Sequence, residues 1–87
     1  MPTNEEDEQK LAELAETYGP LYPFSQHKRG EMIRYTVPGS DGIYLGEVLW
    51  VQSPSEQGGV QLPMRYVVYC EERGFVDIVF VTDLVRA

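Results

Sequence analysis

The chain has few of the residues from which most catalytic and metal-binding sites are built. Its 87 residues include one cysteine and one histidine, Cys70 and His27. A single cysteine excludes an internal disulfide, and one thiolate cannot make a structural zinc site. The neighbours of His27 include neither a nucleophile nor a helix-spaced metal partner, and Glu71 beside Cys70 disfavours a reactive thiolate. The sequence therefore predicts no metal, no cofactor and no catalytic residue.

Long apolar runs and an excess of basic residues are also lacking. No apolar stretch approaches the roughly 18 residues that span a bilayer, and residues 1–10 are acidic, unlike a signal peptide. Seven basic residues face fourteen acidic ones, so the net charge is −7. Such a charge repels phosphate backbones and anionic lipid surfaces. We therefore expect a cytoplasmic protein that binds neither nucleic acid directly nor membranes.

The chain does contain four runs rich in β-branched and aromatic residues, separated by glycine, proline and polar residues. Runs of this kind predict strands, and the short connections within each pair predict antiparallel neighbours. The predicted strands are 31–37, 43–52, 64–72 and 75–81. Residues 53–63 are predicted to form a mobile polar loop. After the last strand, 82–85 is typical of one helical turn, capped by Thr82 and with Leu84 pointing inward.

The N-terminal segment has the period of a helix. Its apolar residues recur with the 3.6-residue spacing of one helix face. Thr3 or Asn4 is the expected N-cap, and Gly19 followed by Pro20 ends the helix. An extended connector, 20–30, follows because proline fixes φ. The apolar helix face consists of Leu11, Leu14, Ala15 and Tyr18, and the expected anchors of the connector are Leu21, Tyr22 and Phe24.

Alternation along the predicted strands leaves apolar residues on both faces of the sheet. In 75–81, Val76 and Ile78 point to one side, and Phe75 and Val79 to the other. An apolar exterior needs a cover, which the helix, the connector or a second copy of the chain can provide. We favour helix coverage with some self-association. In 43–52, strict alternation groups Ile43, Leu45, Leu49 and Val51 against Tyr44, Val48 and Trp50.

This layout resembles the SH3-like small barrels. The matching features are a glycine-led second strand and a last strand that runs into a single helical turn. The resemblance covers residues 30–87 and implies a mainly β, five-stranded SH3-like barrel. Residues 1–29 would then be an acidic, amphipathic N-terminal α-helix and its connector. The matching segments are 30–35, 46–51, 66–69 and 76–79.

Among such barrels the chain is similar to the plasmid-borne type II dihydrofolate reductases, which carry a Val-Gln-Ile-Tyr segment in their last long strand. That resemblance implies a tetrameric pore that binds folate and NADPH. The chain departs from it at the ligand-binding positions: Asp77 replaces the glutamine, Val79 the tyrosine, and Tyr35 a lysine of the first strand. A pore lined with carboxylates repels phosphate groups. A reductase-like pore enzyme is therefore an alternative only.

Aromatic residues interleaved with carboxylates are the candidate binding chemistry. Tyrosine and tryptophan rings attract arginine and lysine, and nearby carboxylates strengthen that attraction. The same aromatic residues can equally be core residues. Asp77 either anchors a cationic group of a partner or pairs with Arg34 or Arg65 across strands. The candidate ligand-binding residues are Tyr35, Tyr44, Glu47, Trp50, Tyr66 and Asp77.

The sequence favours a non-catalytic protein-interaction module. Its expected partner is a basic or proline-containing peptide segment, held by an aromatic patch around Tyr35, Tyr44 and Trp50 with loops 37–44 and 53–63 as rims. Besides the pore enzyme, an acidic mimic of nucleic acid that occupies a DNA-binding protein is an alternative suggested by the charge. A homo-oligomer remains open.

Overall fold

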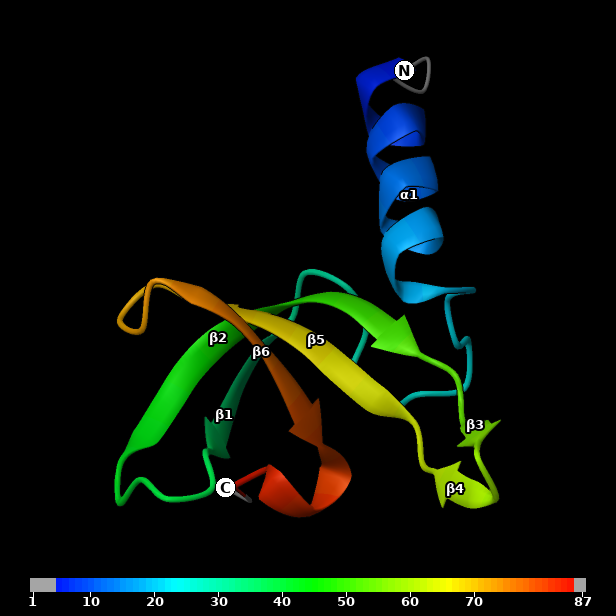
Figure 1. Cartoon of the computed structure of the whole chain (residues 1–87). Helices are drawn as coiled ribbons and strands as arrows, with labels where there is room; N and C mark the ends of the chain where they lie inside the picture. The colour runs from blue at the N-terminus through cyan, green and yellow to red at the C-terminus, as the bar shows by residue number, and fades with distance from the viewer. Residues whose placement is uncertain (1–4, 86–87) are drawn as a thin grey trace.

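The computed structural model describes residues 5–85, which form one α-helix, six strands and a 3-10 turn (Figure 1). The predicted mainly β class is confirmed. No helix in this part of the chain is long and apolar enough to cross a bilayer. The elements are α1 (Glu5–Tyr18), β1 (Met32–Thr36), β2 (Ile43–Gln52), β3 (Ser55–Gln57), β4 (Val60–Leu62), β5 (Arg65–Cys70), β6 (Phe75–Phe80) and η1 (Val81–Asp83).

Four strands form a curved antiparallel sheet in the order β1-β2-β5-β6 (Figure 1). The sheet is not closed into a barrel, since β1 and β6 do not pair with each other within residues 5–85. The reason is that β6 passes directly into η1, so only the segment after η1 reaches β1. There Leu84 bridges Tyr35, and the Val85 N–H donates to the Arg34 carbonyl at 2.9 Å.

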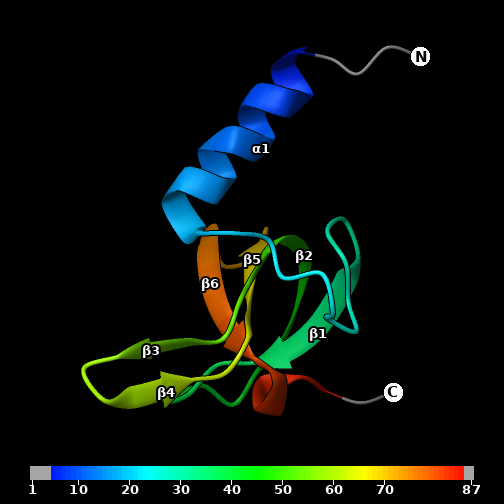
Figure 2. The same cartoon turned by 90° about the vertical axis from the view of Figure 1, so that its right-hand side faces the viewer.

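Residues 53–63 form a hairpin where the sequence predicted a mobile loop. Strands β3 and β4 pair through Gln57 and Val60, and the hairpin projects from the sheet (Figures 1 and 2). Its two-residue turn is Gly58-Gly59, with φ of 57° and 83°. Left-handed backbone at both positions of a two-residue turn favours glycine and matches the twist of the strands. The Gly-Gly pair was therefore a hairpin signal.

The hydrophobic core lies on the concave side of the sheet and includes two tyrosines. Tyr35 of β1 is fully buried and Tyr66 of β5 is 1% exposed. Leu84 packs against this core, as predicted. Asp83, and not Thr82, caps η1, because its carboxylate accepts the Phe80 N–H at 3.3 Å. The core residues are Ile33, Tyr35, Val48, Val51, Tyr66, Val68, Cys70 and Val79.

A bulge in β2 breaks the strict alternation that the sequence predicted. The register with β5 shifts between Val48 and Trp50, so Val48 and Val51 both reach the core while Trp50 pairs with outward-facing Val67. The connector stabilises the bulge, since Arg29 Nε donates to the Leu49 carbonyl at 2.9 Å. An extra residue of this kind leaves no signal in an alternating pattern.

Helix α1 covers only a small part of the outer face of the sheet. Figures 1 and 2 show it standing away from the strands, with its C-terminal end against them. At that end Trp50 Nε1 donates to the Gly19 carbonyl at 2.9 Å, and Gln52 Nε2 donates to the Tyr18 carbonyl at 3.2 Å. The predicted apolar helix face is half-buried throughout. The predicted caps Thr3 and Asn4 lie outside the described residues.

The connector between α1 and β1 follows the sheet as predicted, but two of its three expected apolar anchors, Leu21 and Phe24, are exposed. The Tyr22 N–H donates to the Val51 carbonyl at 2.9 Å, and the Tyr22 ring packs against the core. Phe24 is 80% exposed, and its ring lies edge-to-face with that of Tyr22, at 5.6 Å between centroids. Phe24 is therefore not the anchor that the sequence predicted.

Replacing Gly46 tests the close packing of β2 on β5. A Cβ at this position would lie 2.4 Å from Val68 Cγ1 and 2.8 Å from the Tyr69 carbonyl oxygen. We expect Gly46→Ala to lower the free energy of unfolding by about 2 to 3 kcal/mol, because a backbone atom cannot move aside easily. Urea denaturation measures the change. The control is Gly42→Ala, whose Cβ meets only the end of the Tyr44 side chain at 3.3 Å. Equal effects of the two variants would contradict the packing argument.

Candidate functional site

A partly buried carboxylate joins the two edge strands of the open sheet. Asp77 lies on β6, on the same side of the strand as the core residue Val79. Its Oδ2 accepts the Tyr35 hydroxyl of β1 at 2.8 Å and Arg73 Nε from the β5–β6 turn, also at 2.8 Å. The Asp77 side chain is 13% exposed and that of Arg73 is 21% exposed. The ion pair is therefore screened from water on most sides.

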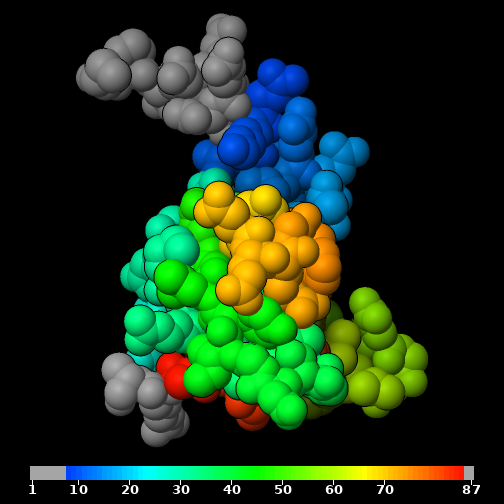
Figure 3. Space-filling model, turned by 90° about the vertical axis from the view of Figure 1, so that its left-hand side faces the viewer, coloured from blue at the N-terminus to red at the C-terminus, as the bar shows by residue number. Residues whose placement is uncertain are grey.

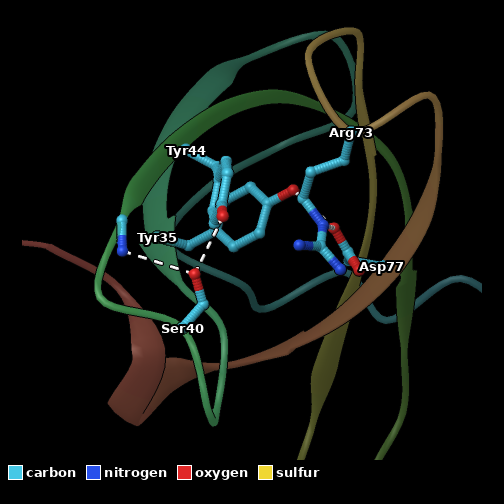
Figure 4. A network of polar contacts seen from close by, with 6 residues as sticks. Tyr35, Ser40, Tyr44, Arg73 and Asp77 are labelled. Carbon is cyan, nitrogen blue, oxygen red and sulfur yellow. Dashed lines mark hydrogen bonds and ion pairs between the residues drawn. The ribbon is translucent and has the colours of Figure 1, made fainter.

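Two aromatic rings hold the Arg73 guanidinium beside this carboxylate. Its central carbon lies 5.0 Å from the centroid of Tyr44 on β2 and 4.5 Å from that of Phe75 on β6. Figure 4 shows Arg73 between Tyr44 and Asp77, with Tyr35 behind them. Ser40 fixes Tyr44, since the two hydroxyls are 2.9 Å apart. We call Tyr44, Phe75 and Asp77 the guanidinium clamp.

The surroundings shift the proton affinities of two groups in this cluster. Burial raises the pKa of Tyr35 well above its usual range, and the hydrogen bond to Asp77 raises it further. Burial by itself would lower the pKa of Arg73, but the hydrogen bond to Asp77 and the neighbouring Tyr44 hydroxyl outweigh it, so this pKa is raised. A neutral phenol and a cationic guanidinium therefore face the carboxylate.

The structure brings three of the six predicted ligand-binding residues together and separates the others. Tyr35, Tyr44 and Asp77 meet in the cluster just described. Trp50 is 3% exposed under the end of α1, with Arg29 5.3 Å from its ring. The expected patch around Tyr35, Tyr44 and Trp50 is therefore not one surface, because the bulge turns Trp50 away and both Tyr35 and Trp50 are buried.

Tyr66 and Glu47 lie elsewhere. Tyr66 is a core residue whose hydroxyl accepts the His27 N–H at 3.3 Å. Glu47 is exposed on the outer face of the sheet, paired with Tyr69 of β5. Of the six residues, only Tyr44, Glu47 and Asp77 retain side-chain atoms that a ligand can reach without unpacking the core.

The predicted ion pair of Asp77 with Arg34 or Arg65 is wrong, because Asp77 pairs with Arg73. Arg34 is exposed and alternates with the core residues Ile33 and Tyr35, so it points to the outer face. Arg65 bonds Gln52 at 3.2 Å, at the far end of β5. Sequence reasoning missed Arg73 and Phe75. Strand alternation places Phe75 on the same side as Asp77, but Arg73 lies in the turn before β6, four residues from Asp77, where alternation gives no signal.

The outer face of the sheet carries an apolar surface with no cover in the described structure. We call Leu45, Tyr69, Val76 and Ile78 the outer patch. They are 50%, 41%, 39% and 45% exposed. Tyr69 pairs with Val76 and with Glu47 in the sheet. Figure 3 shows the surfaces of β2 and of the β5–β6 hairpin, coloured green and yellow to orange, lying side by side.

Carboxylates border this apolar surface. Glu47 lies beside Tyr69, and Glu71 and Glu72 are exposed in the turn that follows β5. Cations are also near: Arg34 lies across from Leu45 on β1, and Lys10 and Arg29 line a hollow together with Glu47. Among the described residues, no three histidine, cysteine or acidic side chains are grouped as they would be to hold a metal ion. The outer patch and the residues beside it therefore present apolar side chains and negatively charged carboxylates.

Comparisons with protein-family models, with curated proteins and with solved structures find no match.

Replacing Tyr35 by phenylalanine tests the tie between β1 and β6. We expect Tyr35→Phe to lower the free energy of unfolding by about 1.5 to 3 kcal/mol, the usual contribution of a hydrogen bond to a charged group. Chemical denaturation at pH 7 measures this loss. The control is Tyr69→Phe, because Tyr69 is 41% exposed on the outer face. A loss no larger than that of the control would mean that the tie does not stabilise the fold.

We also expect the stability of Tyr35→Phe to depend on alkaline pH differently from that of the wild type. The raised pKa of Tyr35 means that the folded protein keeps this proton when the unfolded chain loses it, at a pH of about 10. The folded state then binds more protons, so its stability falls as pH rises above that value. We expect Tyr35→Phe to lose stability less steeply between about pH 10 and 11. Denaturation midpoints across this range measure both slopes, and identical slopes would contradict the prediction.

Proposed function

We propose that this chain is a non-catalytic protein-interaction module that binds a basic, partly apolar peptide segment on the outer patch. The observation that carries the proposal is an uncovered apolar sheet face beside exposed carboxylates. Apolar surface left open on one face of a small domain is typical of a binding surface. The negative charge nearby selects the partner, because unlike charges steer the encounter and like charges reject it.

The proposed ligand is basic, as the sequence analysis predicts, but the residues proposed to contact it are different. Glu47 remains, and Tyr44 and Asp77 remain as part of the guanidinium clamp. Tyr69, Val76 and Ile78 take the place of Trp50, Tyr66 and Tyr35, which are buried. An extended segment suits this surface, since β6 is an edge strand and its free side can accept main-chain hydrogen bonds.

We also infer that the fold is an opened variant of the SH3-like small barrel. The supporting observation is the path of the chain after β6: it makes the 3-10 turn η1 and then bridges β1 through Leu84. The division into residues 1–29 and 30–87 stays a prediction. The pore enzyme and the nucleic-acid mimic gain no specific support from residues 5–85, where Asp77 bonds Tyr35 and Arg73.

Binding to a designed peptide tests the proposed function. The probe is a fluorescein-labelled decapeptide that alternates leucine with arginine, compared with one in which glutamate replaces every arginine. We expect only the basic peptide to bind. Ile78→Ser should weaken its binding about tenfold, because burying an isoleucine contributes roughly 1.5 kcal/mol or more. Fluorescence anisotropy measures both affinities, and added salt should lower that of the basic peptide.

Val60→Ser is the matched control for this experiment. Val60 is 60% exposed, but it lies on the β3–β4 hairpin, away from the outer patch. Equal binding of the basic and acidic peptides, or an affinity that Ile78→Ser leaves unchanged, would overturn the proposal. A mass that doubles with concentration in sedimentation, and that Ile78→Ser restores to the monomer, would assign the patch to a second copy of the chain instead.

A further inference from the structure

The side chain of Arg73 occupies a site whose parts come from separate places in the chain. Tyr44 is contributed by β2, and Phe75 and Asp77 by β6. The central carbon of the guanidinium lies over two aromatic rings, and the carboxylate accepts its Nε–H at 2.8 Å. This combination suits a planar cation with several donors better than the compact ammonium of lysine. The rings and the carboxylate of the clamp are therefore suited to binding an arginine side chain.

The position of Arg73 in the chain allows its side chain to rotate out of the clamp. It belongs to the four-residue turn 71–74, which ends at Gly74 with φ of 77°. The Gly74 N–H donates to the Cys70 carbonyl at 2.8 Å, so the turn is closed by its backbone and not by the Arg73 side chain. Rotation of the side chain alone would empty the clamp, leaving both strands paired as before.

The clamp also opens to solvent beside the outer patch. Phe75 is 51% exposed and Tyr44 is partly exposed. Val76, between Phe75 and Asp77 on β6, belongs to the outer patch, so the two surfaces are the two sides of one edge strand. A peptide lying along this edge can place an apolar residue on Val76 and reach the clamp with a long cationic one. Glu71 and Glu72 in the neighbouring turn attract that cation.

We propose that Tyr44, Phe75 and Asp77 form a binding site for the guanidinium of an arginine in a partner, and that Arg73 is its built-in competitor. The proposal rests on the proposed function only for the source of the arginine. Because Arg73 is tethered, a partner's arginine binds only to the fraction of molecules in which the clamp is empty. Removal of Arg73 therefore strengthens binding of an external guanidinium.

The test is a titration of the Arg73→Ala variant with N-acetyl-arginine-N′-methylamide. Backbone amide signals of Tyr44, Phe75 and Asp77 are followed by NMR. We expect saturable shifts, with an affinity at least about tenfold higher than that of the wild type. The lysine analogue should bind more weakly. The matched control is Arg29→Ala, which removes the guanidinium that lies 5.3 Å from the Trp50 ring, a position where Arg29 bonds a backbone carbonyl and no carboxylate. It should create no site.

Two further measurements test the clamp, and the second uses the wild type, so it remains valid if Arg73→Ala is unstable. Adding Phe75→Leu to that variant removes one ring at a half-exposed position and should weaken the probe's binding again. In the wild type, the Arg73 Nε–H signal should move toward that of a free arginine as the basic decapeptide is added. The proposal is overturned if folded Arg73→Ala does not bind the probe, if Phe75→Leu changes nothing, or if the Nε–H signal stays fixed while the peptide binds.

These outcomes separate the clamp from the proposed function. Probe binding to Arg73→Ala, in a protein whose affinity for the basic decapeptide is unchanged by Ile78→Ser, supports the clamp and defeats the proposed function. Decapeptide binding that depends on Ile78, together with an Arg73→Ala variant that ignores the probe, supports the outer patch and defeats the clamp.

Discussion

The fold depends on a side-chain link between two strands that do not pair. Strands β1 and β6 are the edges of the open sheet, and the Tyr35 hydroxyl on one donates to Asp77 on the other. Two carboxylate interactions at 2.8 Å, with Tyr35 and Arg73, compensate the burial of Asp77. Removing either partner would leave the carboxylate under-bonded in a site of low dielectric. The link between the two edge strands and the position of the clamp therefore depend on the same group.

A single extra residue in β2 determines which surface of the sheet is left open. The bulge after Val48 sends Trp50 outward, where the end of α1 and Arg29 cover it. The hydrogen bonds from the sheet to the end of α1 come from Trp50 and Gln52, so this end of the helix covers Trp50. The outer patch beyond it remains exposed, and the guanidinium clamp lies on the other side of the same edge strand. Both proposed contacts with a partner therefore converge on β6.

Much of the fold could be predicted from local patterns. The four long strands, the half-buried helix face and the inward-pointing Leu84 follow from period, propensity and turn residues. The Gly58-Gly59 hairpin was readable but was taken for a loop. The candidate site was predictable only in part: Asp77 and Tyr44 were identified by residue type, but their partner Arg73 was not. A salt bridge within one hairpin and one across strands look alike in sequence, since both need only opposite charges.

The sequence by itself determined the mainly β class of the fold and the acidic charge, because these are sums over residues or short periodic patterns. Only the tertiary structure decided which aromatic residues are buried, where the sheet stays open and which cation binds Asp77. Those outcomes depend on the register of strands far apart in the chain and on the bulge that reverses the direction of Trp50. A shift of one residue exchanges the two faces of a strand, and local sequence does not specify it.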